Sequence, residues 1–86
     1  MPVIARFYGV VVRMTFTPLL GAHFHAISGD HELVVGIEPL AIIQGDAPAR
    51  VRYLVMEWAA RHHQELLQAW YRCQNKLRPQ MIAPLY

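Results

Sequence analysis

The stretch VVVRMTF at residues 10–16 decides the fold. Its apolar side chains at Val10, Val12 and Met14 alternate with side chains on the opposite side, a period of two that is typical of a half-buried strand. Further stretches of strand character lie around it, at residues 3–8, 22–28, 31–37 and 40–43. Because the connections between these stretches are short, successive strands are expected to pair antiparallel. The sequence therefore predicts a meander sheet.

One long amphipathic segment follows the predicted strands. Asp46 is a good N-cap residue, and Pro48 falls in the first turn, where its fixed φ is tolerated. Residues that share one stripe at helical spacing are almost all apolar: Val51, Val55, Trp58, His62, Leu66, Ala69 and Cys73. We therefore expect one long helix over about residues 47–75 that packs against one face of the sheet.

The last residues, 76–86, are too apolar to float freely in water. We expect this tail to dock along the sheet or the helix, or onto another copy of the chain. The predicted fold class is α+β in a single domain over residues 1–86. An antiparallel meander sheet of four or five short strands packs against one long C-terminal helix, with an apolar docked tail.

Composition excludes several classes of protein. The chain has 86 residues, of which 55% are hydrophobic and 16% charged, the reverse of a disordered composition. Because Cys73 is the only cysteine, neither an internal disulfide nor a thiolate zinc cage can form. The start lacks the pattern of a secretory signal, and no apolar run reaches the roughly 18 residues of a membrane helix. A cytoplasmic protein without a membrane partner is expected.

The small net charge of +2 is unevenly distributed. Residues 1–45 carry two arginines against three carboxylates, whereas residues 46–86 carry six basic side chains against three carboxylates. Such charges are common on solvated helix faces. Binding of nucleic acid through the basic helix and tail stays open as an alternative.

The segment His23-Phe24-His25 is the one constellation that could carry chemistry. On a strand, alternation sends Phe24 toward the helix and both imidazoles to the opposite face. Arg13 on the neighbouring strand is expected on that same face, and imidazoles beside a guanidinium suit a phosphate or a carboxylate. We expect a binding patch of Arg13, His23, His25 and Glu32, although two histidines on a solvated sheet face would show the same pattern.

A metal site is the competing interpretation. His62 lies within the apolar stripe, where a histidine is usually a neutral core residue. If His62 met His23 and His25 across the helix–sheet interface, three imidazoles with an open fourth position would suit zinc. That arrangement requires the histidines to face the helix, against the expectation for Phe24. In such a hydrolase, Glu32 or Glu65 would act as the base.

These motifs resemble those of a family of small bacterial proteins, domain-of-unknown-function family 4160. The shared features are the MP-x-I start, the His-Phe-His strand, the helix pattern EWA-x-x-H-x-x-ELL-x-x-W and the ending I-x-PL. The resemblance implies a partner protein, because relatives are often discussed near toxin–antitoxin modules. This chain departs from the family in two places. Gly21-Ala22 stands where paired prolines are usual, and Leu19 stands where many relatives have a further histidine.

The leading hypothesis is a small cytoplasmic protein-interaction module, of the kind associated with toxin–antitoxin pairs, with a His/Arg surface patch. Its partner would be another protein or a second copy of the chain. No cofactor is expected, and an enzyme is disfavoured. The alternatives are a metal-dependent hydrolase or nuclease that uses the His-x-His pair, and a domain that binds a small anion or nucleic acid.

Overall fold

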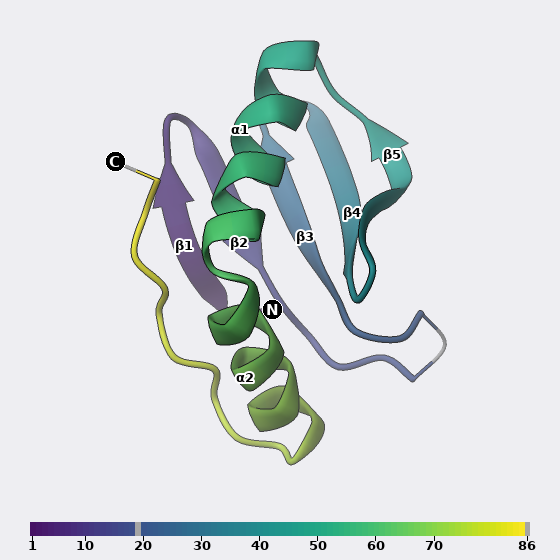
Figure 1. Ribbon diagram of the computed structural model, residues 1–86, viewed down its shortest axis with the longest axis vertical. Coiled ribbons are helices and arrows are strands. Elements are labelled where there is room, and N and C mark those ends of the chain that lie inside the picture. The colour runs from purple at the N-terminus through teal and green to yellow at the C-terminus, as the bar shows by residue number, and fades with distance from the viewer. Residues whose placement is uncertain (19, 86) are drawn as a thin grey trace.

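The computed structural model describes residues 1–18 and 20–85. Its strands are β1 (Val3–Phe7), β2 (Val10–Arg13), β3 (His23–Ser28), β4 (His31–Ile37) and β5 (Leu40–Asp46). They form one antiparallel sheet in the order of the chain, and the helices α1 (Ala49–Arg61) and α2 (His63–Gln74) lie against one face of it (Figure 1). The predicted α+β class and the antiparallel meander are confirmed.

Two strands differ in length from their predictions. β2 ends at Arg13 rather than at residue 16, because the chain leaves the sheet after the Met14 N–H donates to the Pro2 carbonyl at 3.2 Å. β5 extends to Asp46 rather than to residue 43, since an irregularity between Val34 and Val35 of β4 lets the ladder continue. Gly45 has a φ of +87°, and a Cβ there would collide with the Glu32 carbonyl oxygen. Only glycine fits this position.

The prediction of one long helix over residues 47–75 is wrong. Helix α1 begins at Ala49, because Pro48 keeps an extended ψ of 150°, and Asp46 belongs to β5, where its carboxylate accepts from the Ala47 N–H. The two helices meet at His62, whose φ of −114° departs from helical values.

Backbone hydrogen bonds continue across the junction at His62. The His62 N–H donates to the Trp58 carbonyl at 3.1 Å, and the His62 carbonyl accepts from the Leu66 N–H at 2.9 Å. The side chain of His62 is hydrogen-bonded to Glu65 in the first turn of α2, with Nδ1 of His62 2.6 Å from Oε1 of Glu65. Neither helix in the described residues is long and apolar enough to cross a membrane.

Trp58 lies at the centre of the core between the sheet and the helices. Its side chain is fully buried, and its ring centroid lies 5.3 Å from Phe7 of β1 and 5.8 Å from Phe24 of β3. Phe24 therefore faces the helices, as strand alternation predicts. Along β4, the residues on this face are also buried: Leu33, Val35 and Ile37.

Helix α2 ends in a left-handed residue. Lys76 has a φ of +63°, its N–H donates to the Cys73 carbonyl at 3.1 Å, and the Leu77 N–H donates to the Arg72 carbonyl at 2.8 Å. This is the hydrogen-bond pattern of a Schellman ending, in which glycine is the usual left-handed residue. The Arg72 side chain then donates through Nε to the Arg78 carbonyl at 2.8 Å, which holds the chain close to the helix end.

The residues after α2, yellow in Figure 1, run back toward β1. The Ile82 N–H donates to the Ile4 carbonyl at 2.7 Å, and the Trp58 indole N–H donates to the Ala83 carbonyl at 2.8 Å. Ile82 and Leu85 are both buried and belong to the same hydrophobic cluster as the sheet and the helices. This segment therefore contributes to the packing on the outer side of β1.

Candidate functional site

Strand β3 brings the two predicted imidazoles together. His23 and His25 are separated by Phe24, and their ring centroids lie 5.3 Å apart with the planes at 71°, an edge-to-face arrangement. His25 stands on the face opposite the helices and is partly exposed. His23 differs, because only 1% of its surface is exposed. The expectation that both histidines form a surface feature is therefore wrong for His23.

The burial of His23 comes from its position at the first residue of β3. There its ring lies 5.1 Å, centroid to centroid, from Trp70 of α2, and the opposite neighbour across β4 is Gly36, which has no side chain. Trp70 also contacts Phe16, at 5.3 Å between ring centroids. A continuous row of rings therefore runs from Phe16 through Trp70 and His23 to His25.

The hydrogen bond of His23 fixes the hydrogen on its ring. Nδ1 lies 2.8 Å from the Gly21 carbonyl oxygen. A carbonyl oxygen can only accept, so Nδ1 carries a hydrogen and donates it. In the neutral ring, Nε2 then carries a lone pair. This atom is buried and has no hydrogen-bond partner among the described residues.

His25 is held in the same way by Glu32. Its Nδ1 lies 2.9 Å from Oε2 of Glu32, which sits on β4 two pairs further along the ladder and therefore on the same face of the sheet. Because a carboxylate accepts, Nδ1 donates, and Nε2 of the neutral ring again carries a lone pair. Glu32 is about half exposed, so the pair contributes at most about 1 kcal/mol to stability. Its main effect is to fix the orientation of the imidazole.

Arg13 is the fourth member of the predicted patch. It pairs with His25 in the ladder between β2 and β3, which puts it on the same face of the sheet. Its guanidinium donates through Nη1 to the Met1 carbonyl at 2.7 Å. The structure therefore joins His23, His25 and Glu32 by direct contacts, and places Arg13 beside them by register.

His62 does not join this group. Its Nδ1 is hydrogen-bonded to Glu65, and its ring lies 5.6 Å from Trp58 at the junction of the two helices. Within residues 1–18 and 20–85, no group of three or more His, Cys, Asp or Glu side chains could hold a metal ion. The three-histidine site and the role of Glu65 as its base are thus not supported. Leu19, where relatives have a further histidine, lies outside the described residues.

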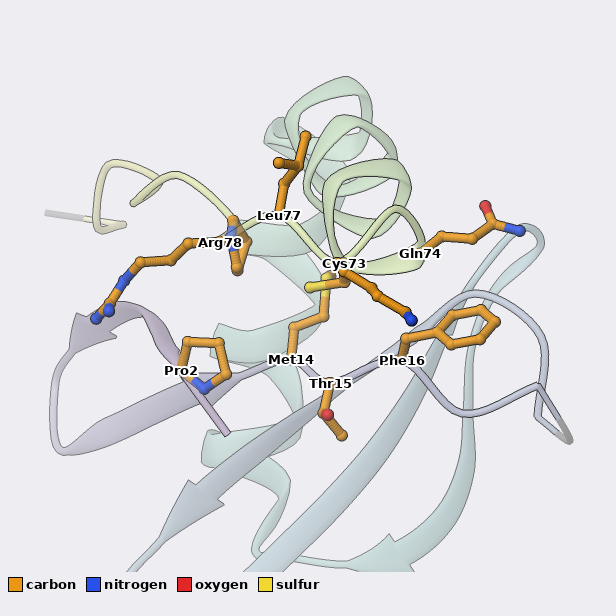
Figure 2. A pocket seen from close by; sticks show the side chains of 10 residues that line it. Pro2, Met14, Thr15, Phe16, Cys73, Gln74, Leu77 and Arg78 are labelled. Carbon is orange, nitrogen blue, oxygen red and sulfur yellow. The ribbon is translucent and has the colours of Figure 1, made fainter.

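A second feature, which the sequence did not predict as a site, is a groove at the C-terminal end of α2. It has a volume of about 650 Å³. Figure 2 shows Met14 and Cys73 near its middle, with Phe16 and Arg78 toward opposite ends. The groove is lined by Pro2, Met14, Thr15, Phe16, Cys73, Gln74, Lys76, Leu77, Arg78 and Pro79.

The lining of this groove combines apolar surface with positive charge. Leu77 is 53% exposed and Phe16 is 37% exposed, so both present apolar surface to solvent. Lys76 and Arg78 contribute cations, and no carboxylate among residues 1–18 and 20–85 lines the groove. Burial raises the pKa of the Cys73 thiol in its wall. The basic second half and the apolar tail were the sequence signals for this region, but neither indicates a groove.

No curated protein and no solved structure matches this chain. The sequence model of one family matches residues 9–71, which is more than half of the chain. The matched range includes His23, His25, Glu32 and Trp70, and it ends just before the α2 residues that line the groove. The chain therefore belongs to the family described as a domain of unknown function, DUF4160.

Proposed function

We propose that this protein is a protein-interaction module that binds a short acidic segment of a partner protein in the groove at the end of α2. The observation that carries the proposal is the lining of the groove. Lys76 and Arg78 supply positive charge beside the apolar side chains of Phe16 and Leu77, and none of the described residues adds a carboxylate to the lining. The partner segment would pair carboxylates with aromatic or aliphatic side chains.

The size of the groove is suited to a few side chains. Its volume of about 650 Å³ lies within the range of roughly 300–1,000 Å³ for ligand pockets. Covering a large apolar side chain contributes about 1.5–3 kcal/mol. Because Phe16 is 37% and Leu77 53% exposed, a segment that covers both would gain about 1–3 kcal/mol before the cost of its ordering is subtracted. Pairing with the exposed cations would add specificity and faster association.

The conformation of Lys76 supports the same proposal. A residue other than glycine in the left-handed region costs on the order of 1 kcal/mol or more, and such positions cluster at functional sites. Glycine would end α2 at lower cost. A lysine at this position places a cation on the groove at the expense of stability. A partner of the kind found in toxin–antitoxin pairs is consistent with the family resemblance.

The proposal is tested with a displayed library of random dodecapeptides selected against the immobilised protein. Enriched peptides are synthesised with a fluorophore, and their dissociation constants are measured by fluorescence anisotropy. We expect enrichment of Asp or Glu beside aromatic or aliphatic residues. The double variant Lys76→Glu/Arg78→Glu should weaken binding at least tenfold, and binding should weaken as salt is raised.

The matched control is Arg50→Glu/Arg52→Glu, which makes the same charge change on exposed residues of α1. This variant should bind the selected peptides as the wild type does. Equal weakening in both double variants would show that overall charge alone drives binding. Peptides enriched without acidic residues would likewise contradict the proposed groove.

A further inference from the structure

The distance between the two imidazoles on β3 matches that of two ligands on one ion. The ring centroids of His23 and His25 lie 5.3 Å apart. Two imidazoles that bind one Zn²⁺ through Nε2, with Zn–N distances of 2.0–2.1 Å, have ring centroids about 5 Å apart. The planes of the two rings are inclined at 71° to each other.

The remaining ring nitrogens have the partners that metal-binding histidines require. Such a histidine usually donates its second N–H to a carbonyl or a carboxylate, which fixes the tautomer and the ring orientation. Here Nδ1 of His23 donates to the Gly21 carbonyl, and Nδ1 of His25 donates to Glu32. In the neutral form, each ring therefore has its lone pair on Nε2, which is the atom that would bind the ion.

The buried Nε2 of His23 is the second, independent observation. A buried polar atom without a partner has lost its hydrogen bonds to water and gained none in return, which is unfavourable. Nε2 of His23 is such an atom, and no described donor reaches it. A cation bound to this lone pair would relieve the cost.

We propose that His23 and His25 form a two-imidazole site for one divalent transition-metal ion of the Zn²⁺ class, with water in the remaining positions. Imidazole ligands favour Zn²⁺, Cu²⁺ and Ni²⁺ over Mg²⁺ and Ca²⁺, which prefer oxygen. Glu32 is a positioning residue, because it fixes the tautomer of His25 without itself contacting the ion. The site is separate from the groove, so neither proposal depends on the other.

The test is a titration of the full chain with ZnCl₂. Isothermal titration calorimetry measures the affinity and the stoichiometry, and NMR of the imidazole ¹⁵N signals identifies the nitrogens that bind. The wild type should bind one equivalent of Zn²⁺, with the largest shifts at Nε2 of His23 and His25, and MgCl₂ should cause none. His25→Gln should weaken binding at least tenfold, and Glu32→Gln should weaken it about 10–100-fold. His31→Gln, an exposed histidine at the start of β4, is the matched control and should bind as the wild type does.

Both test positions are partly or mostly exposed, so these variants should keep the fold, which circular dichroism checks. Unshifted signals of His23 and His25, or unchanged affinity in His25→Gln, would overturn the site. An equal loss in His31→Gln would show nonspecific binding to surface histidines. Zinc binding should persist in Lys76→Glu/Arg78→Glu, and peptide binding should persist in EDTA, so failure of one proposal is distinguishable from failure of the other.

Discussion

The histidine pair on β3 and the groove at the end of α2 are assembled in different ways. His23, His25 and Glu32 lie within ten positions of one another, on two neighbouring strands joined by a tight turn. The groove joins Pro2 and Phe16 to Leu77 and Arg78, which lie at opposite ends of the chain. The first site follows from strand alternation and local register, whereas the second exists only after the sheet and α2 have packed together.

Trp70 connects these two regions, and its removal should have the largest effect. Trp70→Ala would leave a cavity between Phe16 and His23, and loss of a buried tryptophan costs about 3–5 kcal/mol. Urea denaturation should show this loss of unfolding free energy, and both zinc and peptide binding should weaken. Trp70→Phe keeps an aromatic ring and should retain most of the zinc binding and most of the peptide binding. If Trp70→Ala impaired only zinc binding or only peptide binding, the two regions would be independent.

Substitution of Lys76, which belongs to the groove alone, should change the free energy of unfolding by a smaller amount and in the opposite direction, toward higher stability. Lys76→Gly should raise the unfolding free energy by about 0.5–1 kcal/mol, because glycine adopts the left-handed conformation without strain. The same change removes a cation and should weaken binding of acidic peptides. Thermal unfolding and anisotropy measure the two effects. A loss of stability would contradict the assignment of strain to Lys76, and zinc binding should not change.

The smallest expected effect concerns Cys73, the only thiol in the chain and a reporter for the groove. Burial raises the pKa of Cys73 above its usual value, so the reactive thiolate is scarcer than in a free thiol at the same pH. Alkylation by iodoacetamide at pH 8 should be slower than that of glutathione, and should accelerate as the pH rises past 9. A bound peptide should slow it further.

The same shift has a small consequence for stability. Because the pKa of Cys73 is raised in the folded state, the contribution of this thiol to the free energy of unfolding is full below the pKa of the unfolded state. That contribution is lost as the pH rises through the pKa of the folded state.

The control for the alkylation experiment is the unfolded protein. In 6 M guanidinium chloride the alkylation rate of Cys73 should match that of glutathione. A native rate equal to the denatured rate would show that Cys73 is not shielded.

Much of the sheet could be predicted, because its signals are local. The bounds of β4 match the predicted strand over residues 31–37, and Phe24 faces the helices as alternation requires. The helix break could not be predicted in this way. The apolar stripe continues through His62 without interruption, so the pattern indicates an unbroken helix. In the structure, the backbone leaves helical angles at His62, whose side chain contacts Glu65 and Trp58.

The sequence by itself determined the α+β class, the antiparallel order of the strands and the placement of two imidazoles in one strand. These follow from a period of two and from short connections, which act between neighbours in the chain. The tertiary structure alone decided that His23 is buried against Trp70, that His62 pairs with Glu65, and that Phe16 and Leu77 line one groove. Packing between distant segments sets burial, and no local pattern encodes which distant side chain will cover a given residue.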